Sequence, residues 1–209
     1  MSGWSKVAAA VTVGFGVAMG GGLAMAAEIS VLSSNGLKEV LLEAMDDAAK
    51  AGKLAAGSRV TLARTGVAVA VRAGAPKPDI GSADAFRKSL LAAKSFAHSR
   101  GASGVHMAHV IERLGISEQM KPKTVIVDNG PVGAVVAKGE AEMGVQLMSE
   151  LLPVAGIDIV GPLPAALQKM TVLVGGVYSG AREPAAAQAL LKFLSADAAL
   201  PVIRKKGME

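Results

Sequence analysis

The chain has 209 residues and a formal net charge of +5, from 22 Lys and Arg against 17 Asp and Glu. With 51% hydrophobic and 19% charged residues, the composition excludes an intrinsically disordered protein. The absence of cysteine excludes disulfide frameworks, thiolate zinc sites, iron–sulfur clusters and cysteine nucleophiles. The length fits one domain or two small ones.

The first 26 residues are predicted to be a secretory signal peptide. Lys6 gives a basic start, residues 7–27 are uncharged, and Ala24-Met25-Ala26 is a small-x-small cleavage site. Cleavage there would leave 183 residues with a charge of +4 in a periplasm. The alternative is an uncleaved membrane anchor, since 21 uncharged residues could just span a bilayer. The five glycines from Gly14 to Gly22 favour cleavage.

Strands and helices are predicted to alternate along the rest of the chain. Residues 28–33 are β-rich, residues 34–36 interrupt them, and apolar residues then follow at helical spacing over 37–48. A long β stretch is predicted over 59–72. Beyond it, helices are predicted over 83–94, where Ser82 is the cap, up to Leu114, over 132–138 and from Pro184. Strands are predicted at 95–98, 124–127 and 143–147, and a further β stretch within 167–178.

This alternation predicts an α/β fold. No linker is long enough to separate independent domains, so any two lobes must be interleaved. If the chain passes from one lobe to the other along residues 59–72 and returns near residues 171–178, it would form two lobes around a cleft. We therefore expect lobe one, incomplete, at 27–72 plus 175–209, and lobe two at 73–174.

Small residues occupy three predicted strand-to-helix junctions, at 33–36, 101–105 and 129–133. The first turn of a helix has free N–H groups and the positive end of the helix dipole, so it suits an anion. Ligands of open α/β sheets also bind beyond the carboxyl ends of the strands. The alternative is that these Ser, Asn and Gly residues only cap helices and form turns.

Other chemistries find little support in the sequence. His106 and His109 could share a metal, but Glu112 would lie on another side of the predicted helix, and no third histidine is near. No nucleophile elbow and no nucleotide-binding glycine motif is present. We expect no enzyme, cofactor or metal; the weakest alternative is a hydrolase using His106 or His109. Scattered basic residues and four aromatics after the signal argue against nucleic acid as a partner.

Five segments resemble the molybdate-type periplasmic substrate-binding proteins of ABC importers. They are AEISVLSSNGLKEVL, AGSRVTLARTGVAVAVRAGAPKPDI, GASGVHMAHVIERLGI, MKPKTVIVDNGPVGAVVAKGEAEMGVQLMSELLPVAGIDIVGPLP and PAAAQALLKFLSADAALPVIRKKGM. The resemblance implies a type II binding-protein fold, with a tetrahedral oxyanion held between the lobes by uncharged hydrogen bonds. It implies the ligand-binding set Ser33, Ser34, Asn35, Ala102, Ser103, Gly104, Val105, Gly130, Val132, Gly133 and Gln146.

Two departures from the family pattern bear on the ligand. Residues 41–43 join the first helix directly to the helix over 46–54, so a lobe-one strand and one anion loop of the family are missing. The segment 144–149 lacks the tyrosine that molybdate binders tend to carry nearby. We expect an exported subunit that binds a small oxyanion such as molybdate or tungstate and docks to an ABC permease. The alternative is a degenerate non-binding or receptor-docking module of the same fold. A monomer is expected, with a dimer through an exposed sheet edge as the alternative.

Overall fold

The computed structural model describes residues 8–10, 30–32 and 50–209. The predicted loop at 33–36 and the predicted helix at 37–48 lie outside these residues. The chain divides into two compact units, which we call the first unit (residues 1–62 and 174–198) and the second unit (residues 63–173 and 199–209).

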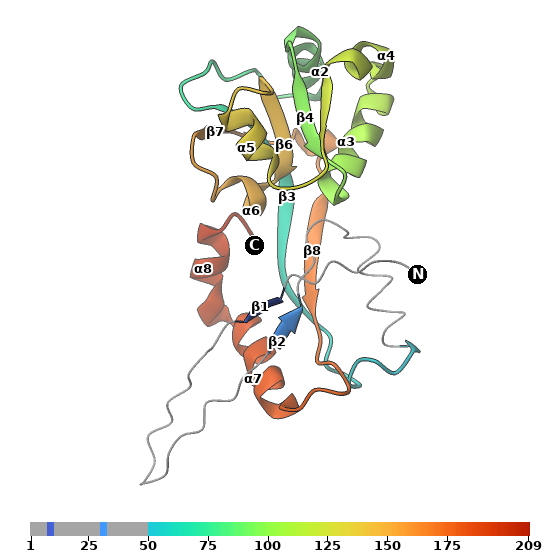
Figure 1. Cartoon of the computed structure of the whole chain (residues 1–209), viewed down its shortest axis with the longest axis vertical. Helices are drawn as coiled ribbons and strands as arrows, with labels where there is room; N and C mark the ends of the chain where they lie inside the picture. The colour runs from blue at the N-terminus through green and yellow to red at the C-terminus, as the bar shows by residue number, and fades with distance from the viewer. Residues whose placement is uncertain (1–7, 11–29, 33–49) are drawn as a thin grey trace. The chain divides into compact units, whose positions relative to one another are not determined.

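A mixed sheet forms the centre of the second unit, with strand order β5-β4-β6-β3-β7, and β8 also pairs with β3 (Figure 1). β4 runs parallel to β5 and β6, whereas β3 is antiparallel to β6 and β7. The carboxyl ends of β4, β5 and β6 therefore meet at one edge. The strands are β3 (Val60–Arg72), β4 (Phe96–Ser99), β5 (Thr124–Val127), β6 (Met143–Leu147), β7 (Ile157–Pro162) and β8 (Met170–Gly175).

Side chains that alternate along β4 divide the core of the second unit between two faces of the sheet. Phe96 packs in a cluster with Met107 and Val110 of α3, whereas its neighbour Ala97 packs with Val132 and Val136 of α5. Successive side chains of a strand point to opposite faces, so α3 and α5 cover opposite sides. The helices of this unit are α2 (Ala83–Ala92), α3 (Ala102–Arg113), α4 (Ser117–Met120), η1 (Lys121–Lys123), α5 (Val132–Ala137), α6 (Met148–Leu151), η2 (Ala165–Leu167) and α8 (Leu200–Lys205).

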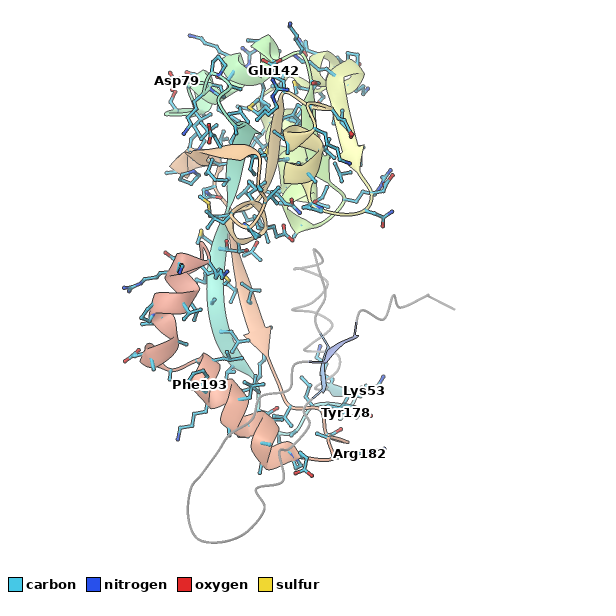
Figure 2. The ribbon with its side chains drawn as sticks, turned by 60° about the vertical axis from the view of Figure 1, so that its left-hand side comes forward. Lys53, Asp79, Glu142, Tyr178, Arg182 and Phe193 are labelled. Carbon is cyan, nitrogen blue, oxygen red and sulfur yellow. The ribbon has the colours of Figure 1, made fainter. Side chains whose placement is uncertain are left out.

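The opposite end of the second unit holds the amino ends of the parallel strands. Glu142, just before β6, accepts a 2.7 Å hydrogen bond from the Lys94 N–H. Asp79 and Glu142 lie at this same end (Figure 2). Ser82 caps α2, as predicted, because its hydroxyl accepts from the Ala85 N–H at 3.1 Å.

The C-terminal residues belong to the second unit because they pair with β3. The Arg64 N–H donates to the Glu209 carbonyl at 2.6 Å, and the Glu209 N–H donates back at 2.8 Å. The Thr65 hydroxyl donates to the Gly207 carbonyl at 2.9 Å. Residues 199–209, which the predicted lobe one includes, thus pack with 63–173. The predicted lobe boundaries themselves stay a prediction.

In the first unit, residues 53–58 run beside residues 177–179. Leu54 forms an isolated antiparallel bridge with Tyr178, and Lys53 and Tyr178 lie next to each other in Figure 2. The buried Ser58 hydroxyl accepts from the Val177 N–H at 3.0 Å. The unit also contains α7 (Pro184–Leu194), and η3 (Asp197–Ala199) spans the point in the sequence where the first unit ends and the second resumes.

Two short strands, β1 (Ala8–Ala10) and β2 (Ser30–Leu32), pair antiparallel. β1 lies inside the predicted signal peptide, so cleavage after Ala26 would remove one partner of this pair. Among the described residues no single helix meets the length and hydropathy required of a membrane span; Pro184–Leu194 and Asp197–Lys205 meet them only when taken together, as a bent pair.

Most predicted elements are confirmed. The strands at 124–127 and 143–147 have the predicted bounds, and β3 begins one residue later than predicted. The helix predicted over 83–94 ends at Ala92, and the strand predicted at 95–98 spans Phe96–Ser99. The sequence did not predict β7, α4, α6 or α8.

Candidate functional site

The candidate site is the carboxyl edge of β4, β5 and β6, all within the second unit. The junctions that follow these strands carry the predicted residues 102–105 and 130–133, and Gln146 lies on β6 itself. β4 pairs with both neighbours, so the three junctions are adjacent at one edge.

The junction between β4 and α3 is closed by a tight contact at Gly104. A Cβ built on Gly104 would lie 1.6 Å from the Ser99 carbonyl oxygen and 2.9 Å from Nδ1 of His98. Only glycine lets the first turn of α3 approach the end of β4 so closely. The Gly101 N–H donates to the Ser99 hydroxyl at 3.2 Å, while Gly101, as N-cap, offers no side chain to the first turn of the helix. The first-turn N–H groups therefore receive no cap from that position.

A shallow hollow of about 340 Å³ lies beside this junction, between α3 and β5. Of the predicted residues it contains Gly104 and Val105, and Val105 is 50% exposed. His98 lines the hollow and is nearly buried; its Nδ1 lies 2.8 Å from the Ser99 carbonyl. Arg100 also lines the hollow, next to the apolar side chains of Val105 and Ile126, so the hollow borders a guanidinium group.

The junction between β5 and α5 is fixed by a hydrogen bond from outside the loop. Gly130 has a φ of 84°, a conformation that favours glycine, and Pro131 precedes the helix. The Val132 N–H donates to Oε1 of Gln146 at 2.8 Å, and Gln146 is only 6% exposed. Gln146 thus ties β6 to the start of α5.

An ion pair links the first two junctions. Nε of Arg100, one residue beyond β4, contacts Oδ1 of Asp128, one residue beyond β5. Both side chains are more than half exposed, so the pair contributes little to stability. It does place a guanidinium group and a carboxylate beside the predicted anion-binding residues, a feature that the sequence analysis missed. The available signal was position, because Asp128 directly follows the strand predicted at 124–127 and Arg100 lies two residues beyond the strand predicted at 95–98.

Glu150 is a second residue that the sequence analysis missed. Burial raises the pKa of its carboxyl group above the ordinary value of 4.5, although hydrogen bonds from the Leu147 backbone and the Gln146 side chain oppose that rise. It lies on α6, directly after β6. The carboxyl edge therefore also holds a partly buried carboxyl group.

The histidines make contacts other than metal coordination. Nε2 of His106 lies 2.7 Å from the Leu167 carbonyl, and Nδ1 of the exposed His109 lies 3.8 Å from a Glu112 carboxylate oxygen. Within the described residues no group of three His, Cys, Asp or Glu side chains could hold a metal ion.

The structure brings the predicted second-unit residues to one edge but buries several of them. Ser103, Gly104, Val132, Gly133 and Gln146 are buried, whereas Val105 and Gly130 are exposed and Ala102 is half-buried. Ser33, Ser34 and Asn35 lie outside the described residues. The role of each residue in ligand binding stays a prediction.

Comparison with known proteins decides the family. The model of the bacterial extracellular solute-binding proteins matches residues 41–209. The chain belongs to this family. This solute-binding protein also shares 43% identity over 167 residues with a protein named aconitate isomerase from Pseudomonas sp. The match covers 79% of the chain but only 64% of that relative's length.

Solved structures show that the fold is that of the type II periplasmic binding proteins. A periplasmic molybdate-binding protein from Azotobacter vinelandii superposes with a TM-score of 0.64 at 20% identity, covering 80% of this chain and 74% of that one. Peb3 from Campylobacter jejuni gives a TM-score of 0.58 at 16% identity, covering 79% and 74%. A similar match, with a TM-score of 0.60 at 16% identity, is PEB3 bound to L-phospholactate, covering 79% and 74%. At these identities the likeness concerns the fold alone.

Proposed function

We propose that this chain is the exported, periplasmic solute-binding subunit of an ABC importer and that it binds a small anion at the carboxyl edge of β4, β5 and β6. The observation that carries the proposal is the Arg100–Asp128 pair, which joins the two junctions that contain the predicted residues. Membership of the solute-binding family supports the transport role. The permease is the membrane partner that the proposal requires.

The ligand would be held mostly by uncharged donors. The first turn of α3, with Ala102, Ser103 and Gly104, offers N–H groups and one hydroxyl, and the loop at 130–133 offers further N–H groups. A hydrogen bond to a charged acceptor is roughly twice as strong as one between neutral groups. The family resemblance also implies Ser33, Ser34 and Asn35 as donors, and these three residues lie outside the described residues.

Two ligand classes fit these donors. The first is a tetrahedral oxyanion such as molybdate or tungstate, which backbone N–H groups can surround without a compensating charge. The second is a small polycarboxylate, favoured by the 43% identical relative and by Arg100, since a guanidinium group matches carboxylate geometry. Arg100 would then leave Asp128 to meet the ligand.

A second candidate function is isomerisation of an unsaturated tricarboxylate. The specific observation in its favour is the name of the 43% identical relative, aconitate isomerase. Incubation of the purified chain with cis-aconitate or trans-aconitate, followed by proton NMR, tests it directly. Interconversion above the rate in buffer would establish the activity; no interconversion, together with binding, would leave transport as the function.

A thermal-shift screen tests the binding proposal. The panel is molybdate, tungstate, sulfate, phosphate, cis-aconitate, trans-aconitate and citrate. A ligand at one hundred times its dissociation constant stabilises the folded state by about 2.7 kcal/mol, so a true ligand gives a clear upward shift in Tm. If no anion shifts Tm, the degenerate or receptor-docking module becomes the better description.

A further inference from the structure

We propose that His98 contacts the ligand in the hollow between α3 and β5, and that a small carboxylate binds there together with one proton. The inference rests on the proposed function and deepens it, because it names the ligand class and a proton requirement of the same carboxyl edge. It is carried by the hydrogen bonding of one nearly buried imidazole ring.

One nitrogen of the His98 ring is already engaged. Nδ1 lies 2.8 Å from the Ser99 carbonyl oxygen. A carbonyl oxygen can only accept, so Nδ1 must carry a hydrogen and donate it. Gly104 packs closely against the same nitrogen, since a Cβ built there would lie 2.9 Å from Nδ1. Because a neutral imidazole has one protonated nitrogen, Nε2 of neutral His98 offers a lone pair and no hydrogen.

The second nitrogen, Nε2, opens to the hollow. His98 makes no further hydrogen bond within the described residues. In this part of the chain no buried side-chain nitrogen or oxygen lacks a partner, so Nε2 is not sealed in the core. The ring is 9% exposed and lines the hollow, which is therefore the space that Nε2 reaches. On β6 its neighbour Val145 is buried, whereas on β5, at the end of the strand order, its neighbour Ile126 is 44% exposed.

The rest of the lining fits a carboxylate that carries a carbon skeleton. Arg100 offers a guanidinium group, which matches the two oxygens of a carboxylate. Val105 and Ala108 of α3 and Ile126 of β5 provide apolar walls. The volume of about 340 Å³ is at the lower end of the range for small-molecule sites. An inorganic tetrahedral oxyanion would leave these apolar walls without a contact.

Few charged groups surround the His98 ring. Arg100 lines the hollow with it, and the Asp128 carboxylate pairs with Arg100. β6 contributes the uncharged Val145 on the other side of β4. The lining residues from α3 are Gly104, Val105 and Ala108, whereas the titratable side chains of this helix are His106, His109, Glu112 and Arg113. The charged groups beside Nε2 are thus Arg100, with Asp128, and the ligand itself.

A carboxylate cannot form a hydrogen bond with neutral His98 unless a proton is added. Carboxylate oxygens only accept, and the lone pair of Nε2 also only accepts, so the two repel each other. One proton from the solvent, placed between them, makes a charge-assisted hydrogen bond from Nε2 to the carboxylate. No covalent bond of the ligand's carbon skeleton changes. Each carboxylate ligand that binds in the hollow should therefore take up about one proton.

Calorimetry in two buffers measures this proton directly. The full chain is titrated with trans-aconitate at about pH 8, where an ordinary histidine is neutral, once in HEPES and once in Tris. These buffers differ in their heat of ionisation, so the difference between the two binding heats gives the number of protons taken up. We expect about one proton per ligand molecule. Binding of trans-aconitate without proton uptake would overturn the proposal.

His98→Gln separates the proton from the hydrogen bond. Its amide nitrogen can donate to a carboxylate without being protonated, so this variant should bind trans-aconitate with no proton uptake. His98→Ala should lose the uptake and weaken binding about tenfold or more, as expected for a lost charge-assisted hydrogen bond. His109→Gln is the matched control on α3, because the exposed His109 contacts Glu112 instead, and it should keep both the affinity and the proton. Unchanged proton uptake in His98→Gln would contradict the role of His98.

NMR of the histidine ring nitrogens needs no substitution at His98 and decides the question even if both His98 variants fail to fold. At about pH 8 the free chain should show His98 with a hydrogen on Nδ1 alone. With trans-aconitate bound, both ring nitrogens should carry a hydrogen. A hydrogen on Nε2 alone in the free chain, or an unchanged ring in the complex, would overturn the proposal.

The outcomes distinguish this inference from the proposed function, with molybdate as the second probe. If trans-aconitate binds without a proton, anion binding stands and the role of His98 is wrong. If molybdate binds and trans-aconitate does not, anion binding again stands and the carboxylate inference is wrong. If neither probe binds, the proposed function fails for both ligand classes, and this inference fails with it.

Discussion

Gln168 pairs with the backbone of Val67 through both ends of its side-chain amide. The Val67 N–H donates to Oε1 of Gln168 at 2.9 Å, and Nε2 of Gln168 donates to the Val67 carbonyl at 2.9 Å. The amide therefore occupies the place of a strand residue beside β3. Gly66 makes room for it, because a Cβ there would lie 3.0 Å from Nε2 of Gln168.

Gln168→Ala should lower the free energy of unfolding by about 1–3 kcal/mol, since it leaves the Val67 N–H without its acceptor in a buried strand. Gln188→Ala, at an exposed position of α7, is the control and should change stability by less than about 0.5 kcal/mol. Urea unfolding of both variants measures the difference. Equal effects would show that the Gln168 amide contributes nothing specific.

Gly104→Ala should destabilise the second unit strongly. The new Cβ would overlap the Ser99 carbonyl oxygen, which is backbone and cannot rotate away, so α3 must move from the end of β4. We expect a loss of at least about 3 kcal/mol, at the upper end of overpacking effects. Gly81→Ala, whose Cβ would meet only the Asp79 side chain at 3.3 Å, should be nearly neutral. Thermal unfolding that ranks the two variants the other way would contradict the close approach.

Glu150→Gln should change how stability depends on pH. Burial raises the pKa of Glu150 in the folded chain, so its contribution to stability is fully present below the unfolded value near 4.5 and is lost as pH rises through the folded pKa. The glutamine does not titrate. The free energy of unfolding of the variant, relative to that of the unaltered chain, should therefore increase as the pH rises from 4 to 8. Denaturant unfolding over this range measures it; a difference that stays flat or falls with pH would contradict the raised pKa.

Arg100→Ala should separate stability from binding. The ion pair with Asp128 is exposed, so its loss should cost less than about 1 kcal/mol of unfolding free energy. If a carboxylate is the ligand, its affinity should fall about tenfold or more, as expected for a lost charge-assisted hydrogen bond. Lys138→Ala removes another exposed cation, paired with Glu140, and is the control. Equal loss of affinity in both variants would indicate only a general effect of charge.

The strands around the site could be predicted because they are short, apolar and bounded by clear signals. Thr124–Val127 is a β-branched run, and Met143–Leu147 is bounded by a polar turn and a helix start. β7 was missed because its pattern is interrupted. Gly161 has a φ of 155°, Pro162 ends the strand, and its pairing with β3 shifts register between Val69 and Ala70.

The contacts that organise the site could not be predicted, because each joins residues that no local pattern relates. Arg100 and Asp128 are 28 residues apart, and Gln168 is 101 residues from Val67. Val132 and Gln146 are 14 residues apart, one at the start of a helix and the other on a strand, so neither the period of a strand nor that of a helix relates them. The sequence could therefore indicate which junctions matter but not which side chains hold them.

Isothermal titration calorimetry tests the central claim of anion binding most directly. The chain with residues 1–26 removed is titrated with molybdate, tungstate, sulfate, phosphate, cis-aconitate, trans-aconitate and citrate. We predict a saturable binding heat with a stoichiometry of one for at least one of these anions. This binding heat should be lost in the Gly104→Ala variant under conditions where that variant remains folded. The absence of binding heat with every anion in the panel would contradict the assignment of the carboxyl edge as an anion-binding site.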